Sequence, residues 1–296
     1  TMISATTAAV PIRPKEGLQR PALRLVKTTS LDRDQWLEVR KGGIGSSDAA
    51  AAVGLHPYKS QLQLWMEKTG RDGGLPVVDP NDDQSPMYWG TLLEPIVAAH
   101  YTKRTGHRVR RVNAVLQHPE HPWMRANLDR EVVGAPDVQI LECKTAGIHG
   151  SRLWREGVPE YVQLQVMHQL AVTGKQAADV AVLIGGQELQ VFRIERDAAM
   201  IAQLIALEQQ FWWYVEQDKE PPADGSDSAE LALRSLYPRD CGTTLDLRQD
   251  LVMSAVFSDL LAVREVIAAQ TATEARLRQS IEQRMGDATR ALFENG

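Results

Sequence analysis

Residues 127–145 have the sequence NLDREVVGAPDVQILECKT, and this stretch decides the fold. Apolar residues over 123–133 and 138–144 predict two strands, joined by the turn formers GAPD at residues 134–137. We therefore predict a β-hairpin here. Successive side chains of a strand point to opposite faces, so we expect Glu142 and Lys144 on one face and Cys143 on the other.

The hairpin would place Asp129 on one strand and Glu142 and Lys144 on the other. Two carboxylates can hold Mg²⁺ through the oxygen ligands that this ion prefers. A metal ion polarises a phosphoryl oxygen and lowers the pKa of a bound water, and an ammonium group stabilises the charge that develops. These residues therefore suit phosphodiester hydrolysis. They also suit a cross-strand ion pair on a solvated face, and the pattern alone leaves both interpretations open.

Three further segments carry compatible chemistry. Glu94 lies in a helix predicted over residues 87–105, where it suits either an acidic site or an ion pair with a basic side chain. Arg40 and the Ser46–Ser47 pair flank a glycine-rich turn, which suits phosphate binding or simply a capped helix start. Gln165 and Gln169 share one face of a helix predicted over residues 160–173, where a glutamine more often bonds neighbouring groups.

Two other patterns point to nucleic acid or metal only weakly. Six basic or histidine residues lie close together and suit either contact with a DNA backbone or a solvated face: Lys103, Arg104, His107, Arg108, Arg110 and Arg111. The segment HPEHP at residues 118–122 holds two histidines between prolines, and no third ligand stands nearby. A turn is the better interpretation of that segment.

The composition is that of a globular protein. Of 296 residues, 43% are hydrophobic and 24% charged, with a formal net charge of −5, so any DNA contact needs a local basic surface. Only two cysteines occur, too few for a cysteine-ligated zinc or iron–sulfur site. No run of apolar residues is long enough for a membrane span, and residues 1–27 lack the apolar core of a signal peptide. We therefore expect a cytoplasmic protein without membrane contact.

The chain divides into three parts by composition. Residues 1–30 have no clear period and predict a loosely ordered arm. Residues 31–222 alternate helical and strand patterns, which predicts an α/β (α+β) domain with a central mixed sheet flanked by helices. Residues 223–296 follow a proline-containing linker and predict a helical C-terminal extension.

Taken together, the chain resembles the YqaJ-type viral recombinase family, relatives of phage λ exonuclease with the PD-(D/E)XK nuclease fold. The resemblance covers roughly residues 31–222. Its segments occur in the order and spacing of the family: residues 40–49 (RKGGIGSSDA), 57–60 (PYKS), 64–65 (LW), 68–70 (KTG), 89–94 (WGTLLE), 127–129 (NLD), 141–145 (LECKT), 165–174 (QVMHQLAVTG) and 194–197 (IERD).

The resemblance implies a Mg²⁺-dependent exonuclease that digests one strand of duplex DNA from a free 5′ end and leaves a 3′ single-stranded tail for recombination. Mn²⁺ could replace Mg²⁺. By position, Asp129 and Glu142 would be the metal ligands, helped by the main-chain carbonyl of Cys143. Lys144 would serve the attacking water, and Glu94 would complete the acidic site directly or through a water.

The resemblance also implies residues that hold the DNA end. Gln165 stands where the family keeps an active-site glutamine. Arg40, Ser47 and Asn127 stand where λ-type enzymes hold the 5′-terminal phosphate, with Asn127 in place of a hydroxyl residue. No arginine stands at the family's further phosphate contact after the catalytic lysine, and Arg152 is the nearest one.

The family further implies a homo-oligomeric ring around the duplex, often a trimer, and a single-strand annealing protein as partner. Two other functions remain open from the sequence. One is an endonuclease or structure-specific nuclease on the same core. The other is a non-catalytic DNA-binding or assembly subunit, although such a subunit has no need of an intact Asp129, Glu142 and Lys144.

Overall fold

The computed structural model describes residues 21–77, 79–147 and 149–294, and the chain forms two units, Thr1–Pro238 and Arg239–Gly296. Most of the arm expected at residues 1–30 lies outside the described residues. Its last part is ordered, because Leu23–Lys27 form a strand, β1, that pairs with β4 (Ala114–Gln117).

The described part of the first unit contains two mixed sheets. One has the strand order β1, β4, β5 (Met124–Ala126), β2 (Ile44–Gly45), and its β2–β5 pair is parallel. The other has the order β3 (Arg108–Arg110), β6 (Arg130–Val133), β7 (Ile140–Ala146), β8 (Ala177–Ile184), β9 (Glu188–Glu195), and its β7–β8 pair is parallel. The mixed sheet predicted from the sequence is confirmed.

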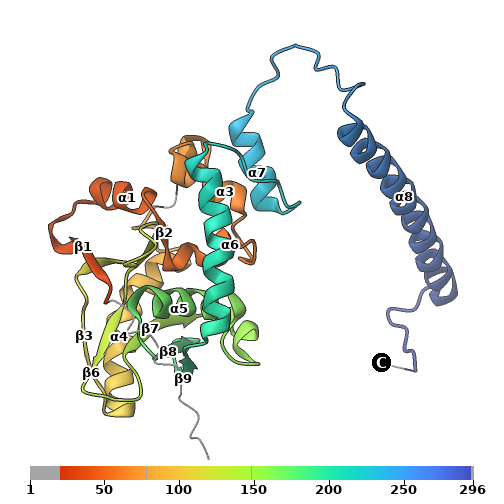
Figure 1. The fold of residues 1–296 in the computed structure, drawn as a ribbon. Coiled ribbons are helices and arrows are strands. Elements are labelled where there is room, and N and C mark those ends of the chain that lie inside the picture. The colour runs from red at the N-terminus through yellow and green to blue at the C-terminus, as the bar shows by residue number, and fades with distance from the viewer. Residues whose placement is uncertain (1–20, 78, 148, 295–296) are drawn as a thin grey trace, which may run out of the picture. The chain divides into compact units, whose positions relative to one another are not determined.

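Helices connect and cover the strands, as Figure 1 shows. The α-helices are α1 (Arg33–Lys41), α2 (Ala49–Ala52), α3 (Gln61–Thr69), α4 (Pro86–Thr105), α5 (Glu160–Thr173), α6 (Ala198–Glu216), α7 (Asp227–Leu236) and α8 (Leu251–Met285). Short 3-10 helices are η1 (Thr28–Ser30), η2 (Ser46–Asp48), η3 (Asp72–Gly74) and η4 (Gly150–Trp154). Among the described residues, no helix combines the length and the apolar character that crossing a membrane requires.

The β7–β8 region lies between two helices. On one face, Val97 and Tyr101 of α4 pack against Leu141 of β7. On the other face, Val166 and Leu170 of α5 pack in a core that also contains alternate residues of β8. Apolar side chains cover both faces of the β7–β8 pair. The polar groups at the end of β7 are therefore held on a rigid framework.

A second core holds the helices that follow the glycine-rich turn. Leu62 and Trp65 of α3 pack with Phe211 of α6 and Ala232 of α7. The hydroxyl of Ser228 at the start of α7 also bonds α3 residues. The first unit therefore ends after Pro238, later than the boundary expected at residue 222. In the second unit, α8 is a single helix without buried residues.

The strand predicted over residues 123–133 is wrong in one respect, because it forms two strands in different sheets. Residues 124–126 are β5 of the four-stranded sheet, and residues 130–133 are β6, which pairs with β7. Leu128 is buried between them, so apolar spacing continues through the crossing. Asp129 therefore lies where the chain passes from one sheet to the other.

Candidate active site

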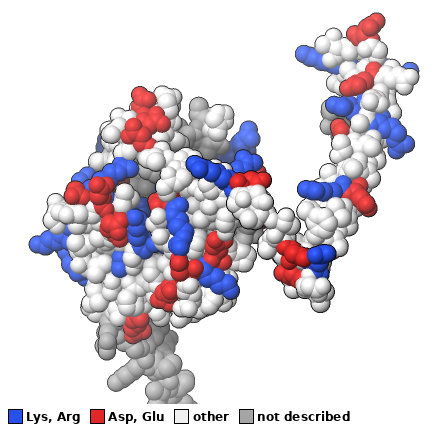
Figure 2. Space-filling view, turned by 90° about the horizontal axis from the view of Figure 1, so that it is seen from above, with Lys and Arg blue, Asp and Glu red and all other residues white. Residues whose placement is uncertain are grey.

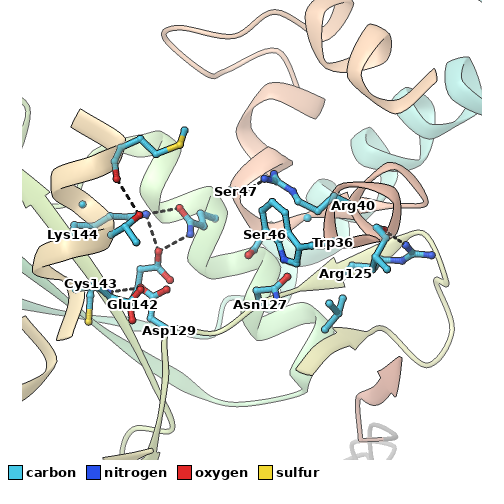
Figure 3. A pocket seen from close by; sticks show the side chains of 18 of the residues that line it. Trp36, Arg40, Ser46, Ser47, Arg125, Asn127, Asp129, Glu142, Cys143 and Lys144 are labelled. Atoms are coloured by element: carbon cyan, nitrogen blue, oxygen red, sulfur yellow. Dashed lines mark hydrogen bonds and ion pairs between the residues drawn. The ribbon is translucent and has the colours of Figure 1, made fainter. Parts of the chain in front are cut away.

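A cavity of about 470 Å³ lies between the two sheets, α1, η2 and α4. At one end it is lined by Asp129, Glu142 and Lys144. At the other end it is lined by Arg40, Ser46, Ser47 and Asn127. Figure 3 shows the carboxylates and the lysine on one side of the cavity and Arg40 on the other. The structure thus brings together the residues singled out in the sequence.

The acidic end is built on β7 and on the crossing that precedes β6. The main-chain N–H of Cys143 donates to Oδ2 of Asp129 at 2.8 Å, which fixes this carboxylate beside β7. Lys144 Nζ lies 2.7 Å from Oε1 of Glu142, while Cys143 packs toward the core on the α4 side. The alternation predicted for β7 is therefore confirmed.

Two amides of α5 hold the Glu142 carboxylate. Gln165 Nε2 donates to Oε1 at 2.6 Å, and Gln169 Nε2 donates to Oε2 at 2.7 Å. The carbonyl oxygen of Gln165 accepts a hydrogen bond from Lys144 Nζ at 2.8 Å. Helical spacing brings both glutamines to the same face, because residues four apart are neighbours on a helix.

Lys144 is a cation in this setting. Burial alone would lower the pKa of its ammonium group, but the Glu142 carboxylate outweighs burial and raises the pKa above its ordinary value. The side chain is still 25% exposed toward the cavity. It can therefore donate to a ligand in the cavity and offset negative charge there, while it has no lone pair with which to accept a proton.

The acidic end fits a divalent cation. Burial and the nearby Glu142 carboxylate raise the pKa of Asp129 to about 8, so two carboxylates are held together with too little positive charge between them. Among the described residues, no cluster of three or more His, Cys, Asp or Glu side chains could hold a metal. Two carboxylates and a carbonyl nevertheless suit Mg²⁺, which keeps several waters and takes few protein ligands.

Glu94 forms an ion pair with a basic side chain, one of the two interpretations that the sequence left open. Its carboxylate pairs with the guanidinium of Arg130, the first residue of β6, at 2.5 Å. Glu94 does line the same cavity. Arg130 is 6% exposed, so it needs a carboxylate nearby, and this long-range partner cannot be inferred from the helical pattern around Glu94.

The other end of the cavity has an excess of positive charge. Nη2 of Arg40 donates to Asp48 Oδ1 at 3.0 Å and to the Ser47 hydroxyl at 3.2 Å. Lys68 Nζ lies 2.7 Å from the other Asp48 oxygen. Burial alone would raise the pKa of Asp48, but Lys68 and Arg40 hold it well below its usual range. Two cations share one carboxylate here, so an anion would be favoured.

Two cavity residues were not expected from the sequence. The guanidinium of Arg40 lies 4.8 Å from the centre of the Trp36 ring, a cation–π contact within one turn of α1. Arg125 reaches under the end of α1 and donates to the carbonyl of Val39. A Cβ at Gly42 would lie 2.7 Å from Arg125 Nη1, so a larger residue there would make the guanidinium group shift. Helical spacing could have predicted Trp36, but no local signal marks Arg125.

The other weak patterns do not contribute to the cavity. Of the six-residue basic run, Arg110 pairs with Glu131 and Arg104 bonds a carbonyl of β9; none of the six is among the described residues that line the cavity, and neither is Arg152. His118 accepts hydrogen bonds from the next turn, as expected for a structural loop. On the visible face in Figure 2, basic and acidic side chains of the first unit are interspersed.

Residues 35–176 match the YqaJ-like viral recombinase domain. The uncharacterized protein YqaJ of Bacillus subtilis (strain 168) is 40% identical over 217 residues, which are 72% of this chain and 66% of that protein. The chain therefore spans just under two thirds of that relative.

Two solved structures have the same fold. One is an alkaline exonuclease (LHK-Exo) of Laribacter hongkongensis, with a TM-score of 0.51, 23% identity, and coverage of 69% of this chain and 98% of that chain. The other is LHK-Exo in complex with dAMP, with a TM-score of 0.50, 24% identity, and coverage of 62% and 93%. The mixed sheets and flanking helices are thus those of the PD-(D/E)XK type. Over residues 35–176 the chain belongs to the YqaJ-like viral recombinase family.

Proposed function

We propose that this protein is a Mg²⁺-dependent deoxyribonuclease that digests duplex DNA from a 5′ end and leaves a 3′ single-stranded tail. The observation that carries the proposal is the juxtaposition of Asp129, Glu142 and Lys144 with a second, cationic end of the same cavity. The carboxylates suit hydrolysis of a phosphodiester, and the cationic end suits a terminal phosphate.

At the acidic end, Asp129, Glu142 and the Cys143 carbonyl would hold the cation. When bound, it would polarise the scissile phosphoryl group and make a water easier to deprotonate. Lys144 would orient that water and offset the charge that develops on the phosphate oxygens. Glu142 and Gln165 keep the Lys144 ammonium in place for this task.

At the cationic end, Arg40 and Ser47 would hold the phosphate at the start of the strand. Asp48 fixes the guanidinium of Arg40, and Lys68 supplies a second positive charge behind it. Binding a terminal phosphate at one end would bring the next phosphodiester to the other end, which makes cleavage depend on a free end. Asn127 lines this end of the cavity and would be a further amide donor.

The resemblance to λ-type exonucleases supports the remaining parts of the proposal. These are a homo-oligomeric ring, such as a trimer, around the duplex, a single-strand annealing protein as partner, Mn²⁺ as an alternative to Mg²⁺, and action in the cytoplasm. A ring would reconcile DNA binding with a net charge of −5, because only its inner wall needs to be basic. Light scattering of the purified protein tests the oligomer.

The experiment that tests the function is digestion of a linear duplex labelled at its 5′ ends or at its 3′ ends, with and without Mg²⁺, beside a closed circular duplex. We expect metal-dependent release of label from the 5′ ends alone and an intact circle. Cutting of the circle would instead indicate an endonuclease. An intact linear duplex with Mg²⁺ or Mn²⁺, together with DNA binding, would indicate a non-catalytic binding or assembly subunit.

A further inference from the structure

Gln169 is a fully buried polar residue beside the acidic end of the cavity. It is 0% exposed and is not among the described residues that line the cavity, so it cannot touch DNA there. Its Nε2 donates to Oε2 of Glu142 at 2.7 Å. The same Nε2 also lies 3.5 Å from the main-chain carbonyl of Asn127, a longer contact. Glu142 is therefore the site carboxylate on which Gln169 acts.

The side-chain carbonyl oxygen of Gln169 has no hydrogen-bond partner among the described residues. Oε1 of Gln169 is buried and accepts no hydrogen bond from any residue that the structure describes. A buried polar atom without a partner costs free energy, and an apolar side chain of the same size would avoid that cost. A glutamine at this position is therefore explained by the task of its donor group.

The hydrogen bonds that the Glu142 carboxylate accepts indicate what the Gln169 donor does. Oε1 accepts hydrogen bonds from both Gln165 and Lys144, and these fill its two lone-pair directions. Oε2 accepts only from Gln169. One lone pair of Oε2 is left, and the direction in which it points is set by the Gln169 bond.

The position of Gln169 is itself fixed by its neighbours on α5. His168 donates from Nε2 to the carbonyl of Arg125 at 2.9 Å, and its Nδ1 lies 2.7 Å from Glu208 of α6. Both side chains of the His168–Glu208 pair are fully buried. The turn of α5 that carries Gln169 is thus anchored to β5 and α6, and a rigid donor positions its acceptor well.

We propose that Gln169 is a positioning residue that directs the free lone pair of Glu142 Oε2 toward the divalent cation and thereby sets the affinity for that cation. This rests on the proposed function, because it needs a cation between Asp129 and Glu142. Gln165 differs from Gln169 in that it also holds Lys144.

The test uses Gln169→Met, which keeps the size and shape of the side chain but removes the donor. Gln163→Met is the matched control, because Gln163 lies on the exposed side of the same helix. Mn²⁺ binding to the intact, metal-free proteins is measured by isothermal titration calorimetry. We expect Gln169→Met to weaken binding about 10- to 100-fold, the range usual for residues that orient a metal ligand, and Gln163→Met to leave it unchanged.

A kinetic readout separates positioning from general damage to the fold. At saturating Mn²⁺ we expect kcat of Gln169→Met to approach that of the unmodified protein, with the metal concentration at half-maximal rate raised by the same factor as the dissociation constant. Circular dichroism and thermal unfolding verify that the variant is folded, and Gln169→Leu serves if it is not.

The outcomes distinguish the two proposals. Unchanged Mn²⁺ affinity in a folded Gln169→Met or Gln169→Leu variant overturns the role of Gln169 while the nuclease proposal stands. Equal loss in Gln169→Met and Gln163→Met also overturns it, because the effect would then be one of the helix. If the unmodified protein binds no Mn²⁺ but cleaves DNA, the metal assignment fails and the Gln169 proposal fails with it.

Discussion

The main-chain N–H of Cys143 donates to the Asp129 carboxylate at 2.8 Å and so joins β7 to the segment where the chain crosses between the two sheets. This one bond places Asp129 beside Glu142, although thirteen positions separate them in the sequence. It also holds the carboxylate in a buried position, where burial and Glu142 raise its pKa to about 8. Below about pH 8 the folded, metal-free site therefore favours the protonated form of the Asp129 carboxyl.

The first prediction concerns the pH dependence of stability. A carboxyl whose pKa is raised in the folded state stabilises the fold at low pH, and that stability is lost as pH rises from the ordinary value of 3.8 to about 8. Asp129→Asn removes the titrating carboxyl group, so the variant does not lose this stability as the pH rises. At about 1.4 kcal/mol per pKa unit the full shift would be worth about 6 kcal/mol, and relaxation of the protein around the charge reduces this value. In EDTA at pH 9 we therefore expect the variant to be more stable than the unmodified protein by at least roughly 2 kcal/mol.

The measurement is thermal unfolding at pH 5 and pH 9 in EDTA, with Asp83→Asn as control, since Asp83 lies in an exposed loop. We expect the difference between Asp129→Asn and the unmodified protein to grow with pH, and no such growth for Asp83→Asn. Parallel pH dependence for all three proteins contradicts the prediction.

The second prediction concerns the buried Asp48. Asp48→Asn leaves the ammonium of Lys68, 8% exposed, without its carboxylate. Removal of one partner of a buried ion pair costs about 3–5 kcal/mol, so we expect a loss of that size in urea denaturation. Glu38→Gln, which breaks the exposed pair with Lys41, should change stability by less than about 1 kcal/mol. Similar losses in the two variants would show that Asp48 does not support the interior.

The third prediction concerns the choice of DNA ends. We expect Arg40→Ala to reduce the ratio of cleavage rates on 5′-phosphorylated and 5′-hydroxyl duplexes about 10-fold or more, because a hydrogen bond to a charged group contributes about 1.5–3 kcal/mol. Lys41→Ala is the control, since Lys41 instead pairs with Glu38 on the surface. An unchanged ratio in Arg40→Ala places the terminal phosphate elsewhere.

The fourth prediction concerns Lys144. Lys144→Ala should lower kcat about 100-fold or more, the usual cost of losing a group that stabilises the charge of a transition state. DNA affinity should change little. The unfolding temperature should fall, because the substitution removes the cation that pairs with the buried Glu142, so activity is compared under conditions where circular dichroism shows the variant folded. Lys175→Ala is the matched control, since Lys175 pairs with Glu131 outside the cavity. Retention of most activity in Lys144→Ala would remove Lys144 from the catalytic group.

The local parts of this fold could be predicted from the sequence. Alternation in residues 138–144 predicted the faces of Glu142 and Lys144, and helical spacing predicted that Gln165 and Gln169 point the same way. These features depend on the chain's own periodicity, which neighbouring residues determine. The ordered set of segments was also sufficient to indicate the family.

The remaining features depend on contacts between distant residues. The strand over residues 123–133 had one continuous apolar pattern, and nothing in that pattern marks where the chain leaves one sheet for the other. The sequence left an ion pair open for Glu94, but it could not identify Arg130 as the partner, because the two residues lie 36 positions apart. The approach of Arg125 to Gly42 is another contact that only the folded chain reveals.

The central claim is that Asp129 and Glu142 hold a divalent cation in the cavity. The most direct measurement is a crystal structure of the protein soaked in Mn²⁺, with anomalous scattering recorded to locate the ion. We predict an anomalous peak between the two carboxylates, within coordination distance of Asp129, of Glu142 Oε2 and of the Cys143 carbonyl, and its loss in Asp129→Asn crystals. A cavity without this peak at saturating Mn²⁺, in a protein that still degrades DNA, would contradict the account.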